Sequence, residues 1–491
     1  MDVFKERNAM DLTCFLNVEE KYNLLEKRIE DYYFWVYART NIAWKYEKEL
    51  EHLGEQHLAG KEKKRDRLKR YIRQMGYILK KGRIPRKQTD ILILDHPRKV
   101  WTGKEYECIY TSEIAKSFCK TTVVEPPYEG RHFEAKDGLQ YIYTDMADLK
   151  SFCHCVYVNK FKSGRFNRIK QLIVDEIRNP IMELNQLYGV ILDVEKISLE
   201  IAYGFFMYEV EKKYYSRILN TCCPKVIIEV VSYSRHCMIM NELTKRKGIP
   251  SIELQHGTIG CEHRAYNFKN SEEIKQFPDY LFVFSEYWRK QADFPIPQDR
   301  IKAVGYPYLE RMSKQYIGTV KEKNKINIVF LSSGPIAGEF IKIAVTLSKR
   351  LNGTKYHVIY KLHPREYSSW KEKYPELLQS DIEVVDGKGP NLYELFSKSH
   401  IQVGTYNTTT VFEGLYWGLK TYIYNYYISS EIAELCRNRY ATLFTDVNEL
   451  ERYIKVQKGE RKSVPTDLWK MNALNNMREE IKKIMDHSSN M

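Results

Sequence analysis

Short apolar runs alternate with segments of helical periodicity through most of this sequence, and that alternation restricts the fold more than any other feature. The first series consists of ILILDH (91–96), PKVIIEVVS (224–232), IPSIELQHG (249–257), DYLFVFS (279–285) and IKAVGYP (301–307). Helix-like stretches such as RHCMIMNELTKRKG (235–248) lie between such runs. This pattern is typical of a parallel sheet covered by helices, so we expect an α/β fold.

A second alternating series follows the polar stretch near residue 320. It runs through INIVFLSS (326–333), YHVIYKLHP (356–364), IEVVDG (382–387), HIQVGTYNTTT (400–410) and KTYIYN (420–425). A chain of 491 residues is too long for one ordinary core. We therefore expect two Rossmann-like domains facing each other across a cleft. The predicted boundaries are a helical, basic extension (1–88), a first α/β domain (89–320), a second one (321–450) and final helices (451–491).

The net charge of +14 is concentrated near the amino terminus. Between Lys61 and Lys87, thirteen Lys or Arg residues oppose only Glu62 and Asp66. The same segment places apolar residues at helical spacing: Leu68, Ile72, Met75, Ile78 and Leu79. Such a basic amphipathic helix can lie on an anionic membrane, hold an acidic polymer or nucleic acid, or pack its apolar stripe on the next domain. Of the binding partners, we expect the membrane rather than nucleic acid.

Two further features bear on location and cofactors. No apolar run reaches the roughly 20 residues of a membrane span, and the amino terminus lacks a secretory signal. We expect a cytoplasmic protein, peripheral at the inner face of the membrane, whose ten cysteines are reduced thiols. The segment Cys153-His154-Cys155 is the only hint of a metal site, and no second ligand pair or Asp-x-Asp follows. We expect no metal and no cofactor.

Three polar clusters follow predicted strands, where ligands bind in open parallel sheets. The first contains Gln255, His256, Gly257 and Thr258, which we assign to the acceptor side of the cleft. A neutral imidazole at His256 is suited to take a proton from a hydroxyl, or to donate a hydrogen bond to a phosphate. In the first role, His256 should give an activity limb at about pH 6 to 7.

The other two clusters are typical of a phosphate site. Hydroxyl and amide side chains lie in the turn between a strand and a helix, where backbone N–H groups and the helix dipole attract anions, although a plain Thr-rich N-cap has the same composition. Glu413 is suited to accept hydrogen bonds from a ribose. His363 follows a strand between Lys361 and Arg365 and can donate to phosphate oxygens. The turn residues are Gly404, Thr405, Asn407, Thr408, Thr409 and Thr410.

The segments KLHPRE and GTYNTTTVFEGLYWG, preceded by LQHGTIG and VGYP, resemble bacterial GT-B glycosyltransferases that build capsular and other surface polysaccharides. The similarity extends over residues 225–450 and includes polysialyltransferase-like, Kdo-transferase-like and CDP-glycerol polymerase enzymes. It implies that His363 contacts the donor phosphate, that Thr408 to Thr410 hold it, and that Glu413 lies near the nucleoside. His256 matches a histidine proposed to act on the acceptor hydroxyl.

The resemblance leaves the base and the reaction open. Polysialyltransferases use an acidic residue before a glycine, for which this chain offers only Tyr128-Glu129-Gly130; Glu129 and Glu253 are therefore further candidates. The expected function is transfer of a sugar from a nucleotide donor to a growing surface glycan. The alternatives are a CDP-alditol phosphotransferase, a non-hydrolysing nucleotide-sugar epimerase and a nucleotide-binding scaffold without turnover. Deleting residues 1–88 is expected to impair a membrane-bound transferase but not an epimerase.

Overall fold

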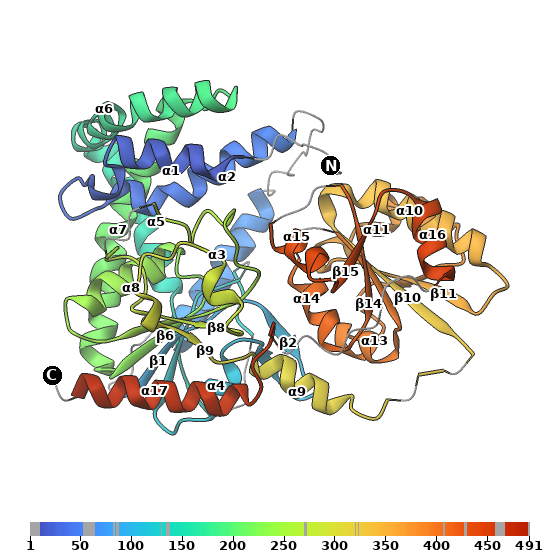
Figure 1. Cartoon of the computed structure of the whole chain (residues 1–491). Helices are drawn as coiled ribbons and strands as arrows, with labels where there is room; N and C mark the ends of the chain where they lie inside the picture. Colours follow the sequence, from blue (N-terminus) through green and yellow to red (C-terminus); the bar gives the residue numbers. More distant parts are fainter. Residues whose placement is uncertain are drawn as a thin grey trace. The chain divides into compact units, whose positions relative to one another are not determined.

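The computed structural model describes residues 10–52, 64–81, 84, 88–128, 130–133, 138–269, 273–319, 321–322, 324–405, 408–426, 430–456 and 467–489. The chain divides into two compact units (Figure 1). The amino-terminal unit contains the described residues of 10–256, 261–305 and 472–489. The carboxy-terminal unit contains those of 257–260 and 306–471.

The amino-terminal unit is built on a parallel sheet of seven strands in the order β5-β4-β1-β6-β7-β8-β9. Its central strands are short and buried on both faces, because helices cover them from both sides. The topological switch point lies between β1 and β6, where the chain leaves one half of the sheet and starts the other. The strands are β1 (Ile91–Leu94), β4 (Thr121–Glu125), β5 (Gln140–Tyr143), β6 (Val226–Glu229), β7 (Ser251–Leu254), β8 (Tyr280–Val283) and β9 (Ile301–Ala303).

Helices and one hairpin complete this unit. The antiparallel hairpin pairs β2 (Lys99–Trp101) with β3 (Tyr106–Cys108) and follows β1. Side-chain caps fix helix ends; Asp193, for example, accepts from the backbone N–H of Glu195 at 2.8 Å at the start of α7. The helices are α1 (Leu12–Lys21), α2 (Phe34–His52), α3 (Lys64–Lys81), α4 (Ser112–Lys116), α5 (Asp145–Phe161), α6 (Ser163–Tyr188), α7 (Val194–Cys222), α8 (Arg235–Lys245) and α17 (Ala473–Ser489).

Helices α1 and α2 are part of the core of this unit, which differs from the predicted extension that ended at residue 88. Phe15 and Trp35 are buried in the same apolar cluster as Leu92 and Leu94 of β1. Arg39 of α2 forms a buried ion pair with Glu19 of α1 at 2.6 Å and donates to the backbone oxygen of Arg264 at 2.8 Å. Deleting residues 1–88 would remove these contacts and damage the fold. The activity of that truncated protein therefore does not distinguish a transferase from an epimerase.

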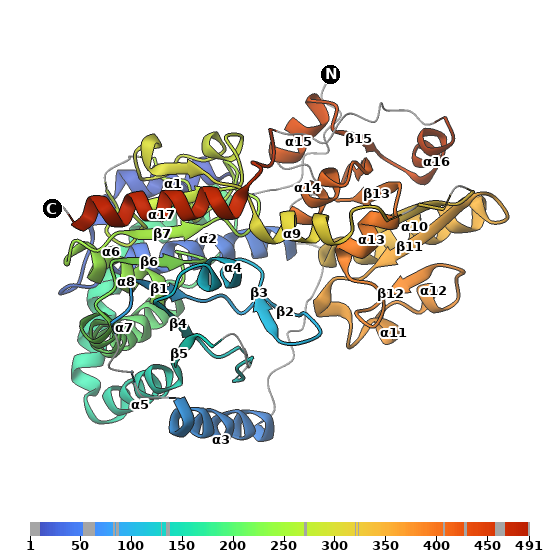
Figure 2. The same ribbon diagram turned by 90° about the horizontal axis from the view of Figure 1, so that it is seen from below.

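The chain also returns to this unit at its far end. Helix α17 packs against α4 and β6 and buries Ala473, Met477 and Ile481, and Figure 2 shows it lying along the unit that contains β6 and β7. We predicted that residues 451–491 form separate final helices. Instead, α16 (Val447–Lys455) belongs to the carboxy-terminal unit and α17 to the amino-terminal one.

The carboxy-terminal unit repeats the plan with six parallel strands in the order β12-β11-β10-β13-β14-β15. Counted along the chain this is 3-2-1-4-5-6, with the switch point between β10 and β13. The predicted α/β class with two Rossmann-like domains is confirmed. The strands are β10 (Ile326–Leu331), β11 (Tyr356–Lys361), β12 (Glu383–Val385), β13 (Ile401–Gly404), β14 (Lys420–Tyr424) and β15 (Ala441–Phe444).

Helices cover both faces of this second sheet. Figure 1 shows α10 and α16 on one face and α13 and α14 on the other, as crossovers of one hand require. The helices are α9 (Pro307–Gln315), α10 (Ala337–Leu351), α11 (Trp370–Lys373), α12 (Pro375–Leu378), α13 (Leu392–Lys398), α14 (Thr409–Tyr416) and α15 (Ser430–Arg437), with α16 as above.

The basic segment predicted between Lys61 and Lys87 forms α3 over its described residues, 64–81. The helix lies beside α5 and β5 (Figure 2) and packs through Tyr77 and Ile78. Three residues of the predicted apolar stripe, Ile72, Met75 and Leu79, are exposed, whereas Ile78 is buried. The stripe is therefore only partly the packing face. None of the described helices combines the length and apolarity needed to cross a bilayer, and all ten cysteines are free thiols.

Candidate active site

Aromatic and imidazole side chains gather beyond the carboxyl ends of β1, β6 and β7 in the amino-terminal unit. His96 follows β1 by two residues, Tyr233 follows β6, and His256 follows β7 by two residues. The rings of His96 and His256 lie 6.2 Å apart, and those of Tyr233 and His256 lie 6.0 Å apart. This cluster occupies the topological switch point, where open α/β sheets bind ligands.

His256 is held from both its backbone and its ring. Its carbonyl oxygen accepts a hydrogen bond from the Tyr110 hydroxyl at 2.7 Å, and its Nε2 lies 3.2 Å from the Tyr233 hydroxyl. Arg98 donates to the Tyr110 hydroxyl at 2.9 Å. The buried Nδ1 of His256 has no hydrogen-bond partner among the described residues. The ring is thus fixed in place, and its Nδ1 is a buried polar atom without a partner among the described residues.

Burial keeps the histidines of this region neutral. Loss of solvation, followed by the charge of neighbouring His96, lowers the pKa of His256 from 6.5 to about 3. The pKa values of His96, His236 and His263 fall to about 4 for the same reason. We expected a limb at about pH 6 to 7 from His256; the depressed pKa corrects that value for the unliganded protein.

Glu253, a candidate base in the sequence, holds the turn after β6. Its side chain is fully buried and accepts from the backbone N–H of Ser232 at 3.0 Å and the hydroxyl of Tyr266 at 2.6 Å. Burial raises the pKa of its carboxyl. The turn contains Val231 at φ 62°, a left-handed conformation that a β-branched residue rarely adopts and that surrounding contacts must enforce. Glu253 therefore supports the segment that carries Tyr233.

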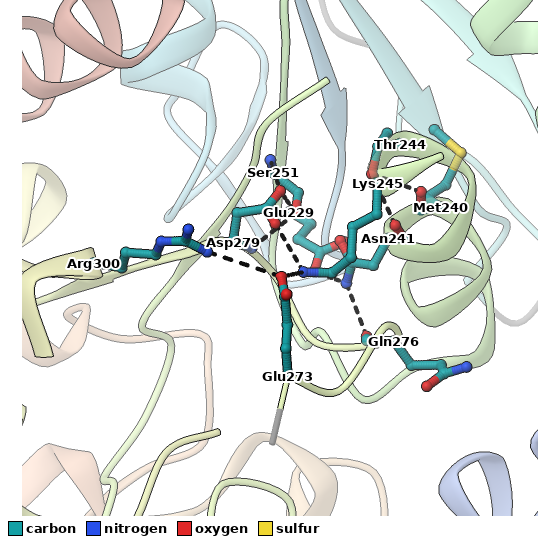
Figure 3. A network of polar contacts seen from close by, with 10 residues as sticks. All are labelled: Glu229, Met240, Asn241, Thr244, Lys245, Ser251, Glu273, Gln276, Asp279 and Arg300. Carbon is teal, nitrogen blue, oxygen red and sulfur yellow. Dashed lines mark hydrogen bonds and ion pairs between the residues drawn. The ribbon is translucent and has the colours of Figure 1, made fainter. Parts of the chain in front are cut away.

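A second buried carboxyl lies beside Glu253, since Glu229 of β6 is its register partner. Burial, followed by the charge of Glu253, raises the pKa of Glu229 to about 8. Asn241 of α8 donates to Glu229 at 2.8 Å and to the backbone oxygen of Gln276 at 3.1 Å (Figure 3). The two strands thus carry a pair of acids that helix α8 holds in the interior.

Ion pairs fix the opposite ends of these strands. Asp279 accepts from the backbone N–H of Ser251 at 2.9 Å and from Lys245 at 2.8 Å (Figure 3). Lys245 also contacts Glu273, which lies 3.9 Å from Arg300. This network joins the start of β7 to the start of β8 and to α8. It sets the register that brings His256 to the carboxyl edge.

Gln255 and the two residues after His256 differ in burial and in the unit to which they belong. The Gln255 side chain is buried and accepts from the backbone N–H of Phe284 at 2.8 Å, which joins the ends of β7 and β8. Gly257 and Thr258 are half-buried and group with the carboxy-terminal unit. Glu129 lies outside the described residues.

A buried network of acidic and basic side chains lies at the ends of β1 and β4, and the sequence did not predict it. His132 contacts Asp145 and Glu125 at 2.7 Å each, so both ring nitrogens donate. Burial disfavours the charged ring, but these hydrogen bonds outweigh it and raise its pKa. Glu125 pairs with Lys99, which lies 3.1 Å from Asp95. The network therefore links the ends of β1 and β4 to the hairpin β2–β3.

The carboxy-terminal unit presents hydroxyl groups at its own switch point. Ser332 and Ser333 follow β10, and Thr405 and Thr408 follow β13. Thr408 is the N-cap of α14 and accepts from the backbone N–H of Thr410 at 3.3 Å. The buried Thr405 hydroxyl has no partner among the described residues. Backbone N–H groups at the start of α14 and these hydroxyls form a surface suited to an anion.

Close packing fixes this turn. A Cβ on Gly404 would lie 2.6 Å from the side chain of Val411, so only glycine lets α14 approach β13 this closely. Thr409 and Thr410 form the first turn of α14 and are half-buried. Asn407 lies outside the described residues.

His363 is the exposed N-cap of a short helical turn after β11. The ring Nδ1 of His363 accepts from the backbone N–H of Arg365 at 3.2 Å, and the backbone N–H of His363 donates to the Glu366 carboxylate at 2.7 Å. Because Nδ1 accepts, the proton of the neutral ring resides on Nε2. The cap therefore orients His363 as an Nε2–H donor.

The residues beside His363 differ from one another. Lys361 donates to the Leu362 carbonyl at 2.9 Å and to the hydroxyl of Tyr367, and burial lowers its pKa to about 8. Its ammonium is thus directed into the protein. Arg365 is exposed. The structure gives Arg365 and His363 access to solvent and gives Lys361 much less.

Glu413 lies inside α14 rather than at its surface. Its side chain is 3% exposed. Burial and the nearby Glu413 carboxylate raise the pKa of Tyr393 well above its usual value. We expected Glu413 to face a ribose; the structure places its carboxylate in the interior beside Tyr393 of α13.

The sequence missed the partners of His256. His96 directly follows the apolar run ILIL and one aspartate, the same strand-end signal that drew attention to His256. Tyr110, Tyr233 and His263 lie in irregular segments, and no pattern placed them beside that strand end. Among the described residues, no three His, Cys, Asp or Glu side chains are placed to hold a metal ion.

Comparisons with known proteins gave matches only in structure. No protein-family model and no curated protein sequence matches this chain. The UDP-GlcNAc 2-epimerase from Methanocaldococcus jannaschii is similar over 80% of this chain and 99% of that one, with 10% identity and a TM-score of 0.48. The epimerase from Neisseria meningitidis bound to UDP-GlcNAc has the same coverage and identity, with a TM-score of 0.47.

A glycosyltransferase shows the same kind of similarity. The spinosyn rhamnosyltransferase complexed with spinosyn aglycone matches over 82% of this chain and 97% of that one, with 11% identity and a TM-score of 0.36. Identities this low concern the fold alone.

Proposed function

We propose that this protein is a glycosyltransferase that moves a sugar from a nucleotide-linked donor to a growing bacterial surface glycan. The observation that carries the proposal is the pair of polar switch points. The one between β10 and β13 provides hydroxyls and helix N–H groups for an anion, and the one between β1 and β6 provides neutral imidazoles and phenols. Phosphate binding and proton transfer are the two tasks of such a reaction.

The donor diphosphate would bind at the carboxy-terminal unit. The hydroxyls of Thr408 and Thr409 and the amino-terminal end of α14 would meet its oxygens, and the Nε2–H of His363 would add a further donor. These groups stabilise charge on the leaving nucleotide without a side-chain proton transfer. Arg365 is an exposed cation on the same turn as His363 and adds attraction.

The acceptor hydroxyl would be activated by His256. Burial lowers the pKa of His256 to about 3, so the neutral imidazole is a weak base. A negatively charged group of a substrate bound beside the ring would raise that pKa, because it favours the protonated imidazole. The base would therefore become effective when such a group is bound. The alternative role, a hydrogen bond from His256 to phosphate, predicts weaker donor binding when the ring is removed.

A transfer assay separates the candidate reactions. Purified protein would be given radiolabelled CMP-, CDP-, UDP- and GDP-linked donors with surface-glycan acceptors. Label in the glycan supports the proposal. Interconversion of the free nucleotide sugar supports an epimerase, release of CMP with label in a phosphodiester supports an alditol phosphotransferase, and binding without product supports a scaffold. The last three outcomes would each overturn the proposal.

Substitutions at the donor site test its placement. His363→Ala, and Thr408→Ala with Thr409→Ala, should each weaken donor binding by about tenfold or more, since each removes hydrogen bonds to a charged group. His357→Ala on the same strand is the matched control, because His357 contacts Glu383 at the opposite end of β11. Donor affinity that is equal in all variants would refute the assignment.

We further propose that α3 docks the protein on an anionic membrane. The helix contains eight Lys or Arg residues and one acid. Its exposed stripe of Ile72, Met75 and Leu79 is suited to the acyl boundary, and each basic residue near the surface contributes about 1 kcal/mol. Such docking would keep the enzyme near a lipid-linked glycan.

A further inference from the structure

We propose that a row of four aromatic rings beside the candidate active site, three exposed and one (Phe133) half-buried, binds the sugar chain of the acceptor. The row begins on the hairpin, where Trp101 and Tyr106 are register partners with ring centroids 5.1 Å apart. It continues through Phe133, 5.0 Å from Tyr106, to Tyr128, 6.4 Å from Phe133. This inference rests on the proposed transferase function and adds a site for its second substrate.

The exposure of these rings is the first argument. Trp101 is 58% and Tyr128 47% exposed, and Tyr106 is also exposed. Large aromatic side chains normally bury most of their surface, so a contiguous exposed set indicates a surface for a ligand. Sugars present flat apolar C–H faces and polar edges, which suits rings whose faces are open and whose surroundings are polar. Lys104 and Arg131 are exposed on the same two segments.

The position of the row is the second argument. The hairpin follows the carboxyl end of β1, and the segment 128–133 follows the carboxyl end of the neighbouring strand β4. Both therefore lie at the edge of the sheet that carries His96 and His256. Tyr110, two residues after β3, donates to the backbone of His256. A glycan lying on the row would have its end directed toward the imidazole cluster.

The rigidity of the row is the third argument. Lys99 anchors the hairpin two residues before Trp101 through Asp95 and Glu125. His132 anchors the next segment one residue before Phe133 through Glu125 and Asp145. The hairpin and the segment that carries Phe133 are thus both fixed by the Glu125 carboxylate. Fixed rings lose little entropy when a flexible chain binds.

The test is glycan binding by surface variants of the full-length protein. Dextran, hyaluronan and chondroitin oligosaccharides would be titrated by calorimetry against wild type, Trp101→Ala and Tyr128→Ala. Each substitution should weaken binding by about three- to tenfold, which corresponds to the loss of one aromatic contact. Trp44→Ala is the matched control, because Trp44 is 46% exposed on α2 and belongs to neither segment of the row.

Kinetics provide a second readout. Both variants should raise KM for the glycan acceptor and leave KM for the nucleotide donor unchanged. Equal glycan affinity in wild type and variants, no affinity for any of these glycans, or binding of the row to lipid vesicles instead would overturn the inference. Donor binding and donor turnover in the same preparations show separately whether the proposed transferase function stands.

Discussion

The titration of His256 tests the physical basis of the candidate site. Its pKa of about 3, against an ordinary 6.5, corresponds to about 5 kcal/mol of preference for the neutral ring. We expect the ring to remain neutral down to about pH 5 in the unliganded protein. The cause is loss of solvation, so a bound anion should shift the titration upward.

The sign of the effect on stability follows from linkage. Below pH 6.5 the unfolded chain binds a proton at His256 that the folded protein does not, so stability is present above that pH and is lost as the pH falls toward 3. Between pH 7 and 5 the loss is about 2 kcal/mol for this residue. Glu229 acts in the opposite sense, because its raised pKa of about 8 makes the folded state bind the extra proton. The contribution of His256 to the pH dependence of stability is therefore obtained only by comparison with a variant that lacks this histidine.

The assay is nuclear magnetic resonance of protein labelled with ¹⁵N-histidine. The His256→Gln variant identifies the signal, and the same protein in urea gives the unfolded reference. The His256 signal should stay constant from pH 8 to 5 in the folded protein and move near pH 6.5 in urea. The free energy of unfolding of wild type should fall by about 2 kcal/mol more than that of the variant between pH 7 and 5.

A folded-state titration of His256 near pH 6.5 would refute the argument. It would mean that water reaches the ring, and the proposed dependence of the base on a bound anionic group would then fail with it. A shift of the signal to higher pH on addition of a nucleotide diphosphate would support that dependence. His256→Ala should also lower turnover by about 10²- to 10⁴-fold while donor affinity changes little.

Three other tests address the fold and the membrane surface. Arg39→Met should destabilise the protein by about 3 to 5 kcal/mol in urea unfolding, because it leaves a buried carboxylate unpaired; a change below 1 kcal/mol would mean that α2 is not part of the core. Gly414→Ala should cost about 1 to 3 kcal/mol, since a Cβ there would lie 2.0 Å from a buried side chain, and an unchanged melting temperature would contradict that geometry. Ile72→Ser with Leu79→Ser should abolish sedimentation with phosphatidylglycerol vesicles, whereas Ile191→Ser, equally exposed, should not; vesicle binding by the double variant would show that the stripe is not the docking surface.

The fold was predictable because its signals are local. Apolar runs such as ILIL and VIIE, each ended by polar residues, mark strands buried on both faces, and their alternation with helices requires a parallel sheet. The same reasoning placed His256 and the turn after Gly404 at carboxyl ends of strands. Both positions are as expected.

The features that could not be predicted from the sequence depend on contacts between residues far apart along the chain. The pairing of Arg39 with Glu19 and with the backbone near residue 264 decides that the first helices are core, and no local pattern records it. No local pattern predicts the position of Lys99 either, whose side chain is buried between Asp95 and Glu125. The depressed pKa of His256 depends on burial by four separate segments, so residue type alone suggested a value near 6.5.

The return of α17 to the amino-terminal unit has a consequence for synthesis on the ribosome. The faces of α4 and β6 that this helix covers are made early, and residues 473–489 are translated only after the whole carboxy-terminal unit. Until then the nascent chain carries an uncovered apolar surface at this place. Folding of the first unit therefore finishes after translation of the second, so the two units cannot mature strictly in the order of their sequence.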